Sequence, residues 1–188
     1  MLGLPAGKVI IADYSPAWPA EFQAERARVL AALGGAVRAI EHIGSTAVPG
    51  LAAKPVIDIA LAVDDLAAVP ALVAPLAALG YEFLGEYGLP GRLFFRKGEP
   101  ATHHIHAVRS DSEHWRVWRL FRDYLRRHAE EARRYAEFKR ELAGRFAADR
   151  DAYTRAKTEY VSSILIRAGA EATGYKPPST RLESGNSG

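Results

Sequence analysis

One short segment contains residues with the chemistry of a phosphate and metal site. Gly44-Ser45 follows one apolar run, and Asp58 interrupts the next, with twelve residues between Ser45 and Asp58. Glycine lets the backbone approach a phosphate closely, and a following helical turn directs N–H groups at its charge. A carboxylate among branched apolar residues is costly to bury unless it meets a cation or hydrogen-bond donors. The segment therefore predicts a phosphate-binding turn beside a catalytic, metal-binding carboxylate at Asp58.

Histidines are the candidate partners of Asp58. His104 and His106 alternate along an expected strand and so share one face, whereas His103 points to the other face. His42, just before the Gly-Ser turn, is a third candidate ligand. One carboxylate with two or three imidazoles suits zinc, manganese, iron or nickel better than magnesium. The alternative for each histidine is a hydrogen-bonded packing residue.

Further polar side chains are candidates for holding a phosphate. Thr46 continues the Gly-Ser pair, and Lys54 precedes the strand of Asp58, although it could equally be a solvated loop lysine. Arg92 and Arg96 alternate along another expected strand, which indicates a basic face over the sheet. A second group is expected to lie on a solvent-facing helix surface: Arg119, Arg122 and Arg126.

Extended and helical segments alternate through the first part of the chain. Apolar runs bounded by Gly, Pro and Asp predict strands over residues 8–12, 37–43, 56–63, 81–87, 92–96 and 102–108. Ser15-Pro16 and Gly34-Gly35 bound an expected helix, and Asp64-Asp65 begins another that ends at Gly80. A short helix is expected over 48–53. The run at 56–63 has the composition of a central strand, and the last three strands predict an antiparallel meander.

The C-terminal half is expected to be helical. Ser110-Asp111-Ser112-Glu113 has the pattern of a capping box, and the chain from there to about Arg167 predicts three helices, in which Tyr153 and Lys157 pack and pair. The predicted class is α+β, with a mixed β-sheet core, flanking helices and a helical C-terminal half. We expect one domain over 8–168, with its sheet core at about 8–109 and its helical part at about 110–168. Residues 173–188 predict a disordered tail.

Composition limits the classes of function. The 188 residues include no cysteine, which excludes disulfides, cysteine-ligated zinc and thiol nucleophiles and favours a reducing cytoplasm. No run approaches membrane-spanning length, so no membrane association is expected. The net charge of +3 is small, and the basic excess in the helical part is less dense than nucleic-acid-binding domains usually show. A small-molecule ligand is therefore expected, and the oligomeric state is left open.

The spacing of the first motif resembles the signature of the polymerase-β-type nucleotidyltransferases, in Ile43, Gly44, Ser45, Asp58, Ile59 and Leu61. Longer blocks resemble the GrpB family, small bacterial proteins placed in that superfamily. These blocks are EHIGSTAVPGLAAKPVIDIA, GLPGRLFFRKG, HHIHAV, FRDYLRRH and YTRAKTEYV. The resemblance runs from about Val9 to about Ile166.

The resemblance implies a nucleotidyltransferase-like fold and a nucleotide-related activity. In the superfamily the Gly-Ser turn positions a triphosphate, and paired carboxylates hold divalent metals. Here Ala60 replaces the second acid, as in the GrpB pattern itself. The implied metal is magnesium or manganese, with zinc as an alternative, and the implied substrate is a nucleoside triphosphate. Some GrpB proteins are fused to dephospho-CoA kinase.

Three functions are compatible with these residues. The first is nucleotidyl transfer to an acceptor hydroxyl, with the metal at Asp58. The second is a non-catalytic module that binds a nucleotide or phosphorylated metabolite. The third is a metal-dependent hydrolase that uses Asp58, His104 and His106 around a bound water.

Overall fold

The structure is a computed structural model that describes residues 2–5 and 8–173; the predicted disordered tail lies outside this range except for its first residue. Within it the helices are α1 (Trp18–Leu33), α2 (Pro70–Ala78), α3 (Glu113–Arg127), α4 (Ala129–Arg145) and α5 (Arg150–Thr173). The strands are β1 (Ala39–Ile43), β2 (Ile57–Val63), β3 (Tyr81–Phe83), β4 (Leu93–Lys97) and β5 (His103–Arg109). The predicted α+β class is confirmed, with the predicted helical C-terminal half.

The strands form one mixed sheet in the order β1-β2-β5-β4-β3. The central pair β2 and β5 is parallel, and the other neighbours are antiparallel. The predicted antiparallel meander is therefore present as β3, β4 and β5. In the central pair Asp58 lies opposite His104, and Ala60 lies opposite His106. This register places the candidate metal ligands on one face, because side chains alternate along a strand.

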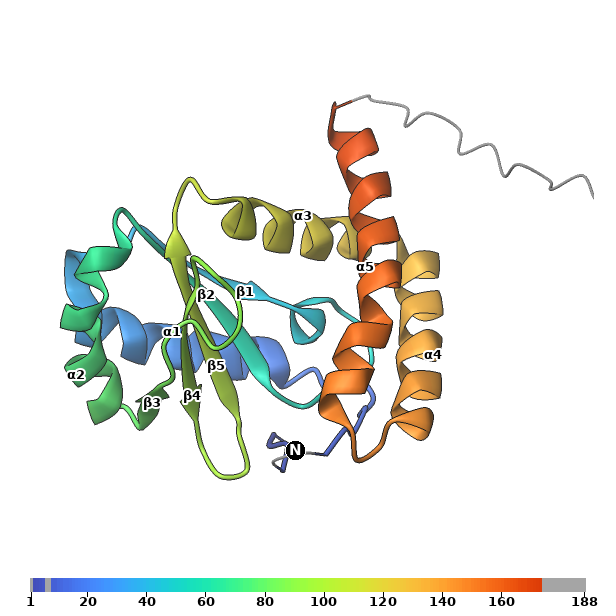
Figure 1. Cartoon of the computed structure of the whole chain (residues 1–188), viewed down its shortest axis with the longest axis horizontal. Helices are drawn as coiled ribbons and strands as arrows, with labels where there is room; N and C mark the ends of the chain where they lie inside the picture. The colour runs from blue at the N-terminus through green and yellow to red at the C-terminus, as the bar shows by residue number, and fades with distance from the viewer. Residues whose placement is uncertain (1, 6–7, 174–188) are drawn as a thin grey trace, which may run out of the picture.

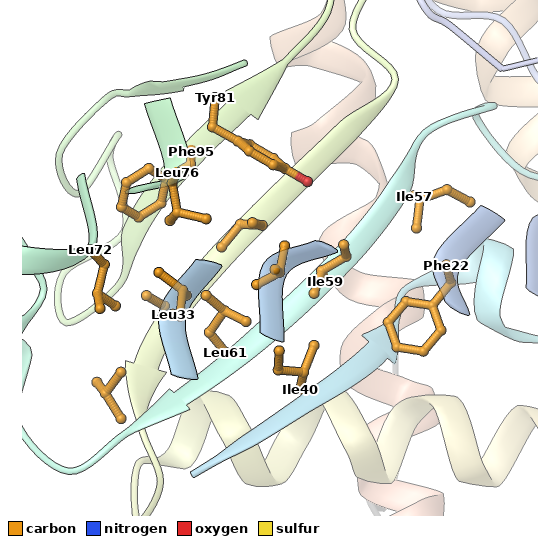
Figure 2. Packing of buried hydrophobic residues seen from close by; sticks show 14 of the residues in the cluster. Phe22, Leu33, Ile40, Ile57, Ile59, Leu61, Leu72, Leu76, Tyr81 and Phe95 are labelled. Carbon is orange, nitrogen blue, oxygen red and sulfur yellow. The ribbon is translucent and has the colours of Figure 1, made fainter. Parts of the chain in front are cut away.

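One face of the sheet is apolar and is covered by α1 and α2. The odd-numbered residues of β2, Ile57, Ile59, Leu61 and Val63, pack there against buried side chains of both helices (Figure 2). Burial of this apolar surface is the main favourable contribution to folding, at roughly 25 cal/mol per Å². The even-numbered residues, including Asp58, point to the opposite face.

The opposite face is partly covered by α3, α4 and α5. Figure 1 shows α4 and α5 side by side at the right of the sheet and α2 at its left. Trp115 of α3 packs against Ala60, Ala62 and Val108 at one end of this face. A second cluster joins the loop after β1, through Val48, to buried side chains of α3, α4 and α5. The candidate site lies at the other end of this face, around Asp58.

Two expected elements do not form. Residues 8–12 make no strand: Ala12 makes an isolated bridge to Ala53, and Val9 N–H donates to the Ala147 carbonyl near the end of α4. The helix expected over 48–53 is replaced by a short 3₁₀ turn, Ser45–Ala47, which ends because Val48 is extended and Gly50 has φ 76°. The strand expected over 81–87 ends at Phe83, before a loop of left-handed residues that includes Tyr87 at φ 46°.

Candidate metal and anion site

Asp58 of β2 meets two imidazoles from β5. Its Oδ1 lies 3.1 Å from His104 Nδ1 and 3.3 Å from His106 Nε2. The three side chains are the group of described residues that could hold a metal ion, with ligand atoms within 4.8 Å of one another. The parallel register of β2 and β5 produces this convergence, because it puts the residues on adjacent positions of one face.

The donor set fits a divalent transition metal. Ligands held about 2.0–2.2 Å from zinc lie roughly 3 to 3.5 Å from one another, which agrees with the separations at Asp58. One side of Asp58 remains open, since a third of its side chain is exposed, while His104 and His106 are only 10% and 13% exposed. Two imidazoles and a carboxylate with a free coordination position are typical of catalytic zinc and iron centres. Nδ1 of His106 is buried, and no group among the described residues forms a hydrogen bond with it.

The protonation states favour metal binding. Burial raises the pKa of the Asp58 carboxyl, but hydrogen bonds from His104 and His106 outweigh burial and hold the pKa well below its usual range. Burial also lowers the pKa of His106, which favours its neutral form. A carboxylate beside a neutral imidazole is the state required of metal ligands.

Gly44 leaves room for the Asp58 carboxylate. Its φ is 70°, and a Cβ at this position would lie 2.8 Å from Asp58 Oδ2. A side chain there would therefore collide with the carboxylate and also strain the backbone. The glycine is required by the close approach of the turn to β2, and it leads directly into the 3₁₀ turn that begins at Ser45.

A basic recess opens beside Asp58 at the Gly-Ser turn. This lysine recess has a volume of about 90 Å³, and its lining includes Ser45, Lys54, Asp58, Lys139 and Lys157. The lysines come from the loop before β2, from α4 and from α5, so the tertiary fold brings them together. Three lysine side chains around a small polar recess suit a phosphate or another compact anion.

Lys139 is the most buried of the three, at 2% exposed. Its Nζ lies 2.9 Å from Ser45 Oγ and donates to the Ala52 carbonyl at 2.5 Å. Burial, together with the neighbouring cations Lys157, Arg140 and Lys54, lowers the pKa of Lys139 well below its usual value.

Two larger cavities also reach Asp58. An apolar cavity of about 380 Å³ lies toward α3 and α5 and is walled by Val117, Trp118, Phe121, Val161 and Leu165. A polar cavity of about 510 Å³ lies on the other side, bordered by both imidazoles, Lys54 and the loop at Tyr87. Asp58 thus lies where a basic, an apolar and a polar space meet.

Ala60, at the position of the missing acid, lies in an apolar environment. It is fully buried and packs with Ile43, Val108 and Trp115. A second carboxylate there would point into the contact between β2 and α3 rather than toward the open side of Asp58.

Some predicted site residues lie elsewhere. His42 does not join Asp58: it faces the α1 side of the sheet, stacks on Phe22, and its Nε2 lies 3.0 Å from Thr46 Oγ1. The reason is register, since His42 pairs with Ile59 while Asp58 pairs with the next residue of β1. Thr46 borders the lysine recess, although its hydroxyl also donates to the Val56 carbonyl at 3.4 Å.

Arg92 and Arg96, predicted to share one strand face, lie in different surroundings. Arg92 borders both larger cavities, and its guanidinium donates to the carbonyls of Glu86 and Tyr87 in the loop above the site. Arg96 lines none of the three cavities; it pairs with Glu82 at 2.8 Å. The structure therefore brings Gly44, Ser45, Lys54 and Arg92 to Asp58 but not Arg96.

The prediction that Arg119, Arg122 and Arg126 lie on a solvent-facing helix surface is partly wrong. Arg122 is buried and donates to Glu41 at 2.6 Å and to the His42 carbonyl at 2.9 Å, and Arg126 donates to the Ala47 carbonyl. Both hold α3 against β1 and the Gly-Ser turn.

The sequence interpretation did not assign Lys139, Tyr135, Tyr153 or Lys157 to the site, but they line the lysine recess. Lys54 and Lys157 lie over the Tyr153 ring at 4.3 and 4.8 Å from its centroid. Lys139 lies over the Tyr135 ring at 4.6 Å. A basic residue on the buried stripe of α4 was the available signal, because lysine is rarely buried without a specific reason.

The fold and the site define an α+β protein with one acid and two imidazoles at the centre of a mixed sheet. A family model described as GrpB protein matches residues 8–167, and the chain belongs to the GrpB family. The crystal structure of the conserved protein GrpB from Enterococcus faecalis is 35% identical, with a TM-score of 0.81 over 87% of this chain and 99% of that chain.

Curated relatives agree with this assignment. UPF0157 protein PA4798 of Pseudomonas aeruginosa is 47% identical over 86% of this chain and 67% of its own length. The Glutamate-rich protein GrpB of Alkalihalophilus pseudofirmus is 32% identical over 88% of this chain and 98% of its own length. A dephospho-CoA kinase of Mycolicibacterium paratuberculosis is 35% identical over 86% of this chain, which spans 47% of that protein. None of the helices in the described ranges is long and apolar enough to span a bilayer.

Proposed function

We propose that this protein binds a nucleoside triphosphate together with a divalent metal and transfers the nucleotidyl group to an acceptor. Asp58, His104 and His106 are the proposed metal ligands, and Gly44, Ser45, Lys54 and Lys157 are the proposed phosphate-binding groups. The proposal is supported by one observation above others. The carboxylate that meets two imidazoles also borders the lysine recess at the Gly-Ser turn.

Each part of the site has a separate task in this proposal. A divalent metal bound at Asp58 would polarise the phosphate that is attacked. Lys54 and Lys157 would neutralise the charge of the outer phosphates. The donor set favours manganese or zinc over magnesium, because magnesium prefers oxygen ligands in octahedral geometry. A relative named dephospho-CoA kinase also supports nucleotide-related chemistry.

The test is thermal unfolding with manganese or zinc and ATP, each alone and together. The pair is expected to raise the melting temperature of the wild type, because a ligand at a hundred times its Kd stabilises by about 2.7 kcal/mol. Asp58→Ala should lose the response to metal, and Ser45→Ala should weaken the response to ATP. Asp64→Ala is the matched control, since this exposed acid pairs with Arg38 away from the site.

Unchanged stabilisation by ATP and metal in both site variants would contradict the proposed location. A different result would support the non-catalytic binding module: ATP and metal stabilise the wild type, but a screen of candidate acceptors yields neither labelled acceptor nor pyrophosphate.

A second candidate is a metal-dependent hydrolase. It is favoured by the exposed side of Asp58, which borders the polar cavity, where there is room for water. Hydrolysis of ATP without an added acceptor, lost in His104→Ala and His106→Ala, would favour it over transfer.

A further inference from the structure

Ser45 and Lys139 form a pair that the metal site does not require. Ser45 Oγ lies 2.9 Å from Lys139 Nζ, within hydrogen-bonding distance. Ser45 borders both the lysine recess and the apolar cavity, so its hydroxyl lies between the proposed phosphate site and the space open to an acceptor. A hydroxyl in hydrogen-bonding contact with a base is the minimum arrangement for an activated nucleophile.

The surroundings of Lys139 favour its neutral amine. The charged groups that act on it are cations: Lys54 from the loop before β2, Arg140 from α4 and Lys157 from α5. Within residues 2–5 and 8–173, no carboxylate pairs with Lys139. A buried ammonium without a counterion, close to other cations, is strongly disfavoured.

The hydrogen bonds suit a neutral amine as well. The Ala52 carbonyl can only accept, so Lys139 donates to it. In the neutral form the lone pair of Nζ is left to accept the proton of the Ser45 hydroxyl, because serine can both donate and accept. Lys139 is thus poised as a general base for Ser45.

A protein base is needed here for a second reason. In the two-metal arrangement, carboxylates hold a second ion at the attacking oxygen. The position of the second acid is Ala60, which is buried under Trp115. Activation of the nucleophile must then come from a side chain, and the described residues offer Lys139 on Ser45.

We infer that Ser45 is a nucleophile, activated by Lys139, which accepts the nucleotidyl group of a nucleoside triphosphate as a covalent intermediate. The inference rests on the proposed function and specifies its chemistry. In the first step Ser45 Oγ bonds to the α-phosphorus, its proton passes to Lys139 Nζ, and the bond to pyrophosphate breaks. In the second step an acceptor hydroxyl attacks the same phosphorus and loses its proton to water, and the Ser45–phosphorus bond breaks while Ser45 regains its proton from Lys139.

The experiment detects the intermediate directly. The full chain is incubated with manganese and ATP labelled at the α-phosphate, without an acceptor, and is then denatured and analysed by intact mass and peptide sequencing. The expected result is one nucleotidyl group per chain on Ser45, with release of pyrophosphate. Ser45→Ala should carry no label, whereas Ser163→Ala, on α5 outside the recess, should be labelled like the wild type.

Lys139→Arg removes the base and keeps hydrogen-bond donors at the same position. Arginine does not accept a proton at neutral pH. Labelling is expected to slow by about 100-fold or more, the usual contribution of a general base, while stabilisation by ATP and manganese is kept. Lys8→Arg, at an exposed position, should label at the wild-type rate.

The outcomes distinguish this inference from the proposed function. Stabilisation by ATP and manganese without label on the wild type would overturn the covalent step and leave the proposed function intact. Label that persists in Ser45→Ala, or an undiminished rate in Lys139→Arg, would also overturn the roles assigned here. Absence of both stabilisation and label would overturn the inference and the proposed function together.

Discussion

Ala60 is the residue that separates this site from a two-acid centre. We expect Ala60→Asp to destabilise the fold by about 3 kcal/mol or more, because the new carboxylate would be buried without a partner beside Trp115. It should also fail to create tight magnesium binding. Urea denaturation and magnesium titration measure these effects.

Ala71→Asp is the matched control for this substitution, since Ala71 is exposed at the start of α2 and an acid is tolerated there. A stable Ala60→Asp variant that binds magnesium tightly would contradict the account of the second position.

His42 makes folding stability depend on pH. Burial lowers its pKa to about 4, whereas the unfolded chain has the ordinary value near 6.5. The unfolded state therefore binds more protons between these values, and the free energy of unfolding falls as pH drops from 7 to 4. The difference corresponds to about 3 kcal/mol at 1.36 kcal/mol per pKa unit.

Chemical denaturation at several pH values tests this. His42→Gln, which has no titrating group, should lose about 3 kcal/mol less than the wild type over the same interval. Parallel pH profiles for the two proteins would show that His42 is not the residue responsible.

At the level of single residues, the sequence predicts the candidate metal ligands better than the lysines of the recess. Alternation along a strand predicted that His104 and His106 share a face, and the structure brings both to Asp58. Lys139 could not be found in this way, because its place in the recess depends on how α4 packs against the Gly-Ser turn. The position of His42 depends on pairing register, which strand periodicity does not determine.

Among the elements, α3 depends on one capping residue. Ser112 Oγ accepts from the Trp115 N–H at 3.2 Å, so the predicted capping box acts through Ser112. Ser112→Ala should lower the free energy of unfolding by about 1 kcal/mol, measured by denaturant titration. Ser110→Ala should change it by less than about 0.5 kcal/mol. Equal effects would contradict the assignment of the cap.

The elements themselves were largely predictable, and the exceptions have physical causes. The apolar run at 56–63 forms the buried central strand β2, Gly34 ends α1 and Ser112 caps the start of α3, whereas α1 begins at Trp18 without the side-chain cap expected from Ser15. Residues 8–12 have strand-like composition, yet they lie against the end of α4 instead of joining the sheet. Composition describes how well a segment fits a strand, whereas tertiary contacts decide whether it has a neighbour to pair with.

The whole molecule is held together by a core that both halves share. Val48, Leu51 and Ala52, from the loop after β1, pack with buried side chains of α3, α4 and α5. The single domain over 8–168 stays a prediction, and this shared core supports it. We expect one cooperative thermal transition, in which tryptophan fluorescence and far-UV circular dichroism give the same midpoint.

Leu51→Ala tests the coupling, because Leu51 is 1% exposed in the shared cluster. It should lower both midpoints together, and the free energy of unfolding should fall by about 2–5 kcal/mol. Separation into two transitions would instead indicate that the helical part unfolds independently of the sheet.

The parallel pairing of β2 and β5 also bears on synthesis at the ribosome. The N-terminus of a nascent chain leaves the ribosome first. The Asp58 strand β2 is therefore synthesised before β4 and β5, and Asp58 can contact His106 only after β5 has emerged. The three proposed metal ligands are complete once residue 106 has emerged, but Lys139 and Lys157 emerge later. A growing chain would thus be able to capture a metal ion before it could hold a phosphate, so metallation would precede competence for nucleotide during translation.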